Sequence, residues 1–365
     1  MPATKSPTDS DPDVGEPEVA KGDRRSLYES MVLSRVFETE AERQYKAAKI
    51  GGYCHLSSGQ EATSVGVVAA MEDDDILVTG YRSHGFALAK GISADSVMAE
   101  LFGREDGCAH GRGGSMHLLD VASNFYGGWG IVGGQLPVAT GLALGLVRQD
   151  KPQAVVCELG EGAVNIGAFH ESLNLASLWN LPIVFLVVNN EYGMGTAVAR
   201  ASAEPEIHKR ATAYRMEGER VDGNDLDAVI EATDRLLKAA REERRPALLE
   251  AITYRYRGHS VADAGLAYRT KDEIADHRDN DDPLTRQREK LAADGVSEED
   301  LDAIDDEAKR VVKASVEFAD ASPEPSVDRL AAGVYAPGSA EQFERMRPGS
   351  PFGEEELTFD SGLGE

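Results

Sequence analysis

The chain has 365 residues, of which 64 are acidic and 38 are basic, so its formal net charge is −26. A chain this acidic is not expected to bind nucleic acid or an anionic membrane through its overall electrostatic field. Its apolar fraction of 41% is sufficient for a packed core, and its longest apolar runs are far too short to span a membrane.

The N-terminus and the cysteines indicate a compartment. The first residues are polar and acidic and lack the basic-then-apolar order of a signal peptide. The cysteines, Cys54, Cys108 and Cys157, are odd in number and contain no CxxC pair. Because disulfides are rare in reducing compartments, this pattern predicts a cytoplasmic protein with reduced thiols.

Two acidic segments at the ends are expected to be disordered tails. Residues 1–22 and 337–365 carry charges of −3 and −5 and lack apolar periodicity, which leaves −18 of the −26 for the middle of the chain. Only 12 of the 38 basic residues are Lys. This composition fits a high-salt cytoplasm, where screening weakens self-repulsion, and equally a drift in composition.

Helix and strand signals alternate between these tails. In chain order, the first expected elements are a helix at residues 27–49, a helix ending at residue 71, a strand at residues 76–79 and a helix at residues 93–102. Ser57 and Ser58 each have Gln or Glu three residues later, a capping-box spacing that predicts the start of the second helix.

The most regular pattern is a βαβ unit. An apolar strand at residues 154–159 is followed by a Gly-Glu-Gly turn, a helical run at 163–179 and an apolar strand at 183–188. A crossover of this length predicts parallel strands.

The remaining pattern completes the predicted fold. A helix at residues 226–241 and a strand at 247–254 are followed by charged helices that end near residue 321. We therefore predict an α/β domain at residues 23–281, with a mostly parallel sheet flanked by helices, and a helical C-terminal extension at residues 282–336.

Polar residues follow both strands of the βαβ unit. Glu161 comes after the first strand and Asn190 after the second. Ligands of open α/β sheets bind at the carboxyl ends of strands, and these oxygens beside a helix N-terminus suit a hard cation that holds a phosphate group. A dinucleotide fingerprint is disfavoured, because the next glycine is Gly167 and an acid in the turn repels a pyrophosphate. A plain tight turn is the remaining alternative.

Residues 160–190 closely resemble the thiamine diphosphate motif, which opens with Gly-Asp-Gly and closes with Asn-Asn about thirty residues later. Other segments are similar to the alpha subunit of the decarboxylase component of 2-oxo acid dehydrogenases. These are GGYCHLSSGQEA (51–62), TGYRSHGFALAKG (79–91), HGRGGSMH (110–117), NFYGGWGIVGGQLP (124–137), NNEYGMGT (189–196) and TYRYRGHS (253–260). The resemblance covers about residues 27–336 and implies a thiamine diphosphate-binding fold.

The resemblance also implies a role for each matching residue. Mg²⁺ is expected on Glu161, Asn190 and the backbone carbonyl of Tyr192. The diphosphate is expected against Tyr81, Arg82, Gly162, Ala163 and Arg255, and the aminopyrimidine ring against Gly130 and Val132. The expected catalytic histidines are His55 and His259, the second of which also contacts the cofactor.

Histidines suit the family's reaction, which decarboxylates a 2-oxo acid and passes the acyl group to a lipoyl group of an acyltransferase partner. Protons and negative charge must be handled near neutral pH, where imidazole titrates. A direct role stays open for three other histidines in matching segments, His84, His110 and His117. We expect His170, His208 and His277 to be structural or on the surface.

The chain departs from the family at two places. The family has Asp where this chain has Glu161, whose additional methylene lengthens the side chain by roughly 1.5 Å. Because Mg²⁺ tolerates little ligand displacement, we expect weaker binding than in a Glu161→Asp variant. In a loop that mitochondrial members phosphorylate, Ser260 is retained but a later serine is Ala267, so we expect no kinase control.

The family places its activating glutamate on a separate beta chain. The resemblance therefore implies an α₂β₂ heterotetramer, in which this chain alone is inactive. Pyruvate is the expected substrate, because residues 124–135 and 189–196 are more similar to pyruvate enzymes than to branched-chain ones. The alternatives are a branched-chain 2-oxo acid or acetoin dehydrogenase alpha subunit, and a non-catalytic paralogue with an impaired metal site.

Overall fold

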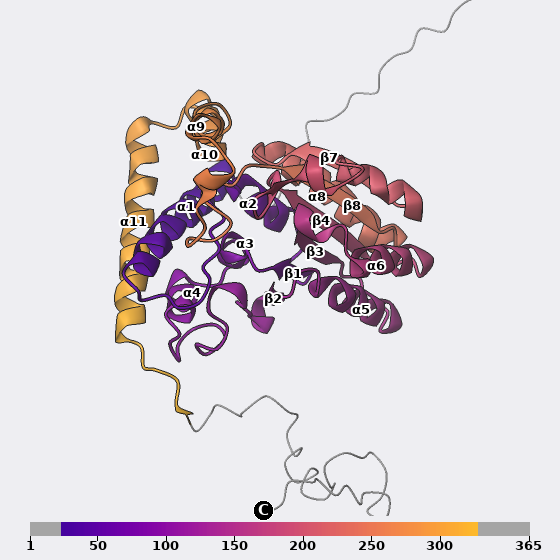
Figure 1. Ribbon diagram of the computed structural model, residues 1–365, viewed down its shortest axis with the longest axis horizontal. Helices are drawn as coiled ribbons and strands as arrows, with labels where there is room; N and C mark the ends of the chain where they lie inside the picture. The colour runs from indigo at the N-terminus through magenta and orange to yellow at the C-terminus, as the bar shows by residue number, and fades with distance from the viewer. Residues whose placement is uncertain (1–22, 328–365) are drawn as a thin grey trace, which may run out of the picture. The chain divides into compact units, whose positions relative to one another are not determined.

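The structure is a computed structural model that describes residues 23–327 (Figure 1). The tails predicted at residues 1–22 and 337–365, and residues 328–336 of the predicted extension, lie outside the described residues. Residues 23–323 belong to one compact unit, and the residues from Glu324 belong to another. Among the described residues, no helix is both long enough and apolar enough to cross a membrane.

The core of the fold is a six-stranded parallel sheet with the strand order β2-β1-β3-β4-β8-β7. The strands are β1 (Ile76–Gly80), β2 (Phe125–Trp129), β3 (Val155–Gly160), β4 (Ile183–Asn189), β7 (Glu217–Asp222) and β8 (Ala247–Ile252). A separate hairpin pairs β5 (Tyr192–Gly193) with β6 (Thr196–Ala197). The parallel pairing predicted within the βαβ unit is confirmed for β3 and β4.

Helices cover both faces of the sheet, as the predicted α/β class requires. They are α1 (Arg24–Lys46), α2 (Glu61–Ala70), α3 (His84–Ala89), α4 (Ala94–Leu101), α5 (Gln135–Arg148), α6 (Gly167–Leu178), α7 (Val198–Ala201), α8 (Leu226–Glu243), α9 (Lys271–Asn280), α10 (Pro283–Ala293) and α11 (Glu298–Ala321). Side chains alternate between faces along a strand. In β3, Val155 packs in one core cluster with Phe169 of α6, whereas Val156 packs in the other with Leu236 of α8.

The charged helices predicted after residue 281 are α10 and α11. In Figure 1, α11 runs alongside α1 and close to α4, and the three helices pack together. The N-cap of α10 is Asp282, whose carboxylate accepts hydrogen bonds from the amides of Leu284 and Thr285. The domain boundary at residues 281/282 therefore falls at the start of a helix and stays a prediction.

The prediction that Ser57 or Ser58 caps the second helix is wrong. The N-cap of α2 is Gln60, and no side chain caps the helix. The hydroxyl of Ser57 instead donates to Oε1 of Glu38 at 2.6 Å, a charge-assisted hydrogen bond to a buried carboxylate. The helix predicted from residue 163 begins only at Gly167, after a 3₁₀ turn at Glu161–Ala163.

The sequence did not predict the helices α3, α5, α7 and α9, the strands β2 and β7, or the β5–β6 hairpin. β2 contains two glycines, and α5 contains Pro137 and two glycines, which weaken both patterns. β7 is an edge strand of mostly polar residues. Because all six strands of the sheet are parallel, the residues that follow them share one edge, and the candidate site lies there.

Candidate functional site

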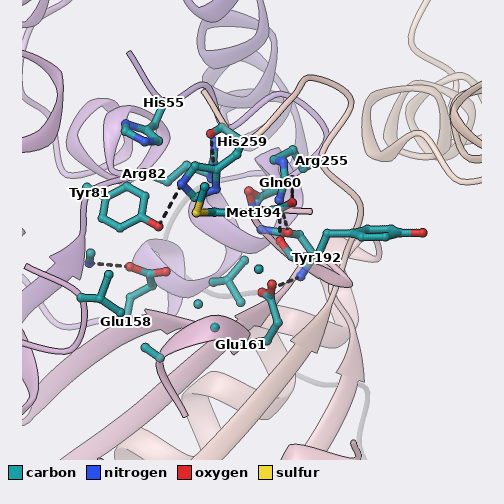
Figure 2. A pocket seen from close by; sticks show the side chains of 18 of the residues that line it. His55, Gln60, Tyr81, Arg82, Glu158, Glu161, Tyr192, Met194, Arg255 and His259 are labelled. Carbon is teal, nitrogen blue, oxygen red and sulfur yellow. Dashed lines mark hydrogen bonds between the residues drawn. The ribbon is translucent and has the colours of Figure 1, made fainter. Parts of the chain in front are cut away.

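A cavity of about 780 Å³ lies at the carboxyl edge of the sheet. It is lined by every residue that the sequence predicts for the site: His55, Tyr81, Arg82, Gly130, Val132, Glu161, Gly162, Ala163, Asn190, Tyr192, Arg255 and His259. In Figure 2, His55, Tyr81 and Glu158 lie along one side of the cavity, and Arg255, Tyr192 and Glu161 lie along the other. The fold thus brings the predicted residues together from segments that are 204 residues apart at the extremes, from position 55 to position 259.

The ends of β3 and β4 place three oxygen donors close together. Oε2 of Glu161 accepts a hydrogen bond from the amide of Asn190 at 3.3 Å. The side-chain oxygen of Asn190 and the backbone carbonyl of Tyr192 both accept from Nη1 of Arg255, at 2.6 and 2.8 Å. Among the described residues Glu161 forms no ion pair, although the charges of Arg255 and Arg82 act on it, so its buried carboxylate is available to a cation.

The backbones of these two strand ends approach closely. A Cβ atom added to Gly193 would lie 3.3 Å from the Cα atom of Gly162, tighter than most real contacts. Glycine therefore lets the turn after β3 and the hairpin after β4 come close enough for the oxygens to converge.

Two guanidinium groups give one part of the cavity a positive charge. Arg82 donates to the backbone carbonyls of Leu56 at 2.6 Å and His259 at 2.7 Å, and Arg255, only 1% exposed, also binds neutral oxygens. Over the described residues, neither arginine forms an ion pair with a carboxylate. Burial and the charge of Arg255 lower the pKa of Arg82 to about 10. This arrangement favours an anion such as a phosphate group.

The cavity also contains a carboxyl group that the sequence did not predict. Glu158, on β3, is 5% exposed and accepts a hydrogen bond from the amide of Gly80 at 2.7 Å. Burial raises the pKa of Glu158 to about 7, and burial also raises the pKa of Glu161. The position of Glu158 within the apolar run of β3 could have indicated a functional residue, because burying a charged group is costly and requires compensating contacts.

The two predicted catalytic histidines form one aromatic cluster with Tyr81. The rings of His55 and Tyr81 are 4.5 Å apart, and those of the two histidines 5.1 Å. Burial, followed by the charge of Arg82, lowers the pKa of His259 to about 4 and that of His55 to about 2. Both imidazoles are therefore neutral at pH 7 and able to accept a proton or a hydrogen bond.

Of the three histidines with an open role, none lines this cavity. His84 is fully buried behind it, with Nδ1 donating to Glu38 at 2.9 Å and Nε2 lying 2.9 Å from Oγ of Ser115. His110 and His117 line a second, shallower cavity with Cys108. The three histidines expected to be structural or on the surface also lie outside the main cavity: His170, His208 and His277.

Several buried polar atoms of the lining lack a hydrogen-bond partner among the described residues. They are Nδ1 of His55, Oε1 of Gln60 and Oε1 of Gln135. Buried polar groups are nearly always paired, so a polar ligand is expected to complete them. The two glutamines were not predicted as site residues, since a glutamine near a helix start has no distinctive pattern.

A buried cavity with two guanidinium groups on one part of its wall and convergent hard oxygens on another is typical of an α/β protein that binds a phosphate-bearing ligand. Comparison with known proteins narrows this class. The family model described as dehydrogenase E1 component matches residues 29–328. The chain therefore belongs to the dehydrogenase E1 component family.

Individual relatives agree with this assignment. The chain is 43% identical over 314 residues to the pyruvate dehydrogenase E1 component subunit alpha of Rhizobium meliloti, covering 86% of this chain and 90% of that protein. It is 41% identical over 319 residues to the somatic, mitochondrial form of Homo sapiens, covering 87% and 81%. It is 40% identical over 308 residues to the subunit of Rickettsia typhi, covering 84% and 94%. The family resemblance is confirmed, and membership implies thiamine diphosphate as the cofactor.

Proposed function

We propose that the chain is the alpha subunit of a pyruvate dehydrogenase, which decarboxylates pyruvate oxidatively and transfers the acetyl group to the lipoyl group of an acyltransferase. The observation that carries this proposal is the convergence, in one buried cavity, of three hard oxygens and two guanidinium groups whose hydrogen-bond acceptors are neutral oxygens. The names of the curated relatives support pyruvate as the substrate.

The donor set fits a magnesium ion. Glu161, Asn190 and the carbonyl of Tyr192 supply a carboxylate, an amide oxygen and a backbone oxygen, the hard ligands that Mg²⁺ prefers. Phosphate oxygens of the cofactor and water would complete its octahedral shell. Two of the three protein oxygens bind Arg255 in this structure, so the fit requires that side chain to move.

The remaining lining residues would hold the rest of the cofactor. Tyr81, Arg82 and Arg255, which line the cavity, would donate to the diphosphate, and the turn at Gly162 and Ala163 would lie against it. The backbone of Gly130 and Val132 would contact the aminopyrimidine ring. When bound, thiamine diphosphate supplies the carbanion that attacks the keto carbon and the electron sink that makes loss of carbon dioxide possible.

The histidine cluster handles protons and negative charge beside the reacting carbon. Neutral His55 and His259 accept or return a proton at the cavity entrance, and the hydroxyl of Tyr81, 3.4 Å from Nε2 of His259, orients that ring. The orphaned Nδ1 of His55 is a ready acceptor or donor for a substrate oxygen.

A beta chain is expected to cover the mouth of this cavity in an α₂β₂ heterotetramer. Three apolar side chains of the cavity lining are exposed: Tyr53, Val132 and Met194 are 64%, 50% and 65% exposed, and Ile131, next to Val132 in the chain, is 74% exposed. Apolar surface of this kind is typical of protein interfaces. The beta chain would supply the activating glutamate, and the cytoplasm is the proposed location.

Reconstitution tests the proposal. The purified chain alone should be inactive, and adding its beta partner with thiamine diphosphate and Mg²⁺ should restore decarboxylation. A panel of pyruvate, branched-chain 2-oxo acids, 2-oxoglutarate and acetoin should show pyruvate as the best substrate. Preference for another substrate of the panel would assign the chain to a dehydrogenase of that substrate instead. Activity of the chain without a beta chain would refute the proposal.

A second candidate is a non-catalytic paralogue that assembles but binds metal poorly. It is favoured by the longer acid at position 161 and by the contact of Arg255 with the metal ligands. A folded heterotetramer that fails to bind thiamine diphosphate at saturating Mg²⁺ would support this candidate.

A further inference from the structure

The guanidinium group of Arg255 is bonded to the oxygens that a metal would need. Nη1 donates to both the side chain of Asn190 and the carbonyl of Tyr192, and Nη2 donates to the carbonyl of Met194 at 3.0 Å and to the hydroxyl of Tyr268 at 3.0 Å. Figure 2 shows Arg255 over the Tyr192 loop on the same side of the cavity as Glu161.

One nitrogen and one metal ion cannot use the same two oxygens in the same way. Nη1 lies 2.6 and 2.8 Å from the two acceptors, and Mg²⁺ binds such oxygens at about 2.0–2.1 Å, so both occupy the space between them. Two cations so close would also repel each other in a buried site. Metal binding and these two hydrogen bonds of Arg255 are therefore alternatives.

Arg255 would gain an anionic partner only when a diphosphate binds in the cavity. Over the described residues it forms no ion pair, and its five acceptors, which include the carbonyl of Arg257, are neutral oxygens. A diphosphate beside Arg82 offers a stronger, charge-assisted acceptor for the same planar group. The diphosphate would thus draw the guanidinium away from the oxygens at the moment when the metal needs them.

We infer that Arg255 acts as an internal stand-in for the metal, holding the Asn190–Met194 loop until the diphosphate releases it, so that metal and diphosphate bind together. This inference rests on the proposed function, because it takes the ligand set from that proposal. It adds that Arg255 lowers the affinity for metal alone. The apparent affinity is reduced by the fraction of molecules in which the ligands are free.

The test measures metal binding without any diphosphate. The heterotetramer is stripped of cofactor and metal with a chelator and titrated with Mn²⁺, and free Mn²⁺ is followed by electron paramagnetic resonance. Wild type should bind weakly, and Arg255→Gln should bind about tenfold more tightly, since releasing the ligands raises the competent fraction. Thermal unfolding in the same titration should show a larger Mn²⁺-dependent rise in Tm for Arg255→Gln.

Arg82→Gln is the matched control, because it removes a cavity guanidinium that touches none of the metal ligands. It should raise the affinity for Mn²⁺ alone by at most about twofold, because the charge of Arg82 acts on Glu161 but its removal frees no metal ligand. An equal gain in Arg82→Gln would mean that general charge repulsion is responsible, which overturns the inference. A merely structural role of Arg255 predicts unchanged or weaker Mn²⁺ binding in its variants, and that outcome also overturns it.

Arg255→Lys covers the case in which the glutamine variant does not fold. Lysine keeps the charge but cannot reach all five acceptors at once, so this variant should bind Mn²⁺ about threefold more tightly than wild type. No gain in a folded lysine variant refutes the inference. The proposed function is judged separately, by whether wild type binds thiamine diphosphate when Mg²⁺ is present.

Discussion

The imidazole of His84 donates from Nδ1 to the carboxylate of Glu38 at 2.9 Å, and both side chains are fully buried. The opposite ring nitrogen lies 2.9 Å from Oγ of Ser115, which in turn accepts from the amide of His55 at 3.3 Å. A buried polar chain thus runs from α1 to the backbone of a cavity histidine. It explains why His84 belongs to a functional segment without lining the cavity.

His84→Ala should destabilise the full chain by about 1–3 kcal/mol, because it leaves the buried carboxylate of Glu38 without one of its hydrogen-bond donors. Urea unfolding measures this. His110→Ala, on an exposed side chain, is the control and should change stability by less than about 0.5 kcal/mol. A small loss at His84 would mean that the buried chain contributes little.

The same contact has a pH signature. Burial alone raises the pKa of Glu38, but the contacts with His84 and Ser57 bring this pKa below its ordinary value. Stability from this carboxylate is therefore present above about pH 4.5 and is lost as the pH falls through the lowered value. Glu38→Gln should weaken the protein at pH 7 and flatten this acid limb in urea unfolding.

Glu158 should give the opposite slope. Its pKa is about 7 in the folded chain, so the folded state keeps a proton that the unfolded state loses above about pH 4.5. Stability should fall by about 3 kcal/mol between pH 4.5 and pH 7 through this group. Glu158→Gln should remove the slope, whereas Glu171→Gln, exposed on α6, should retain it. Identical pH profiles of wild type and Glu158→Gln would contradict this account.

Shortening the acid after β3 should improve the metal site. Glu161→Asp keeps the charge and draws the carboxylate back by roughly 1.5 Å, which we expect to tighten Mg²⁺ in a cofactor-binding titration. Glu161→Gln, which removes the charge, should weaken it. Equal Mg²⁺ dependence of wild type and Glu161→Asp would show that the turn already accommodates the longer side chain.

An anion in the cavity should change the titration of His259. The pKa of His259 is lowered to about 4, mainly by burial and then by the charges of Arg82 and Arg255. A bound pyrophosphate would offset these charges and raise that pKa. Nuclear magnetic resonance of the ¹³C-histidine-labelled chain, with and without inorganic pyrophosphate, measures the shift. No upward movement would argue against phosphate binding beside the arginines.

The βαβ unit and the order of the site residues could be predicted because both follow from strong local sequence patterns. The apolar strands β3 and β4 are bounded by glycines and asparagines, and their ends place Glu161 and Asn190 at one edge. Segments far apart in the chain were joined only through the resemblance, since spacing alone does not place His55 near His259.

The remaining features depend on tertiary contacts. Ser57 does not cap the second helix as predicted; its hydroxyl donates a hydrogen bond to Glu38 of α1. β7 has few apolar residues because it lies at the sheet edge. The contact of Arg255 with Asn190 joins positions 65 residues apart and has no sequence signal.

The close approach of Gly162 and Gly193 sets the size of ion that the site can accept. A methyl group at position 193 would force the two loops apart by a few tenths of an ångström. Mg²⁺ requires short, nearly ideal octahedral bonds, whereas Ca²⁺ accepts longer bonds and irregular shells. In the proposed metal site, we therefore expect ion selectivity to depend on the absence of a side chain at position 193, a residue that is not among the proposed ligands.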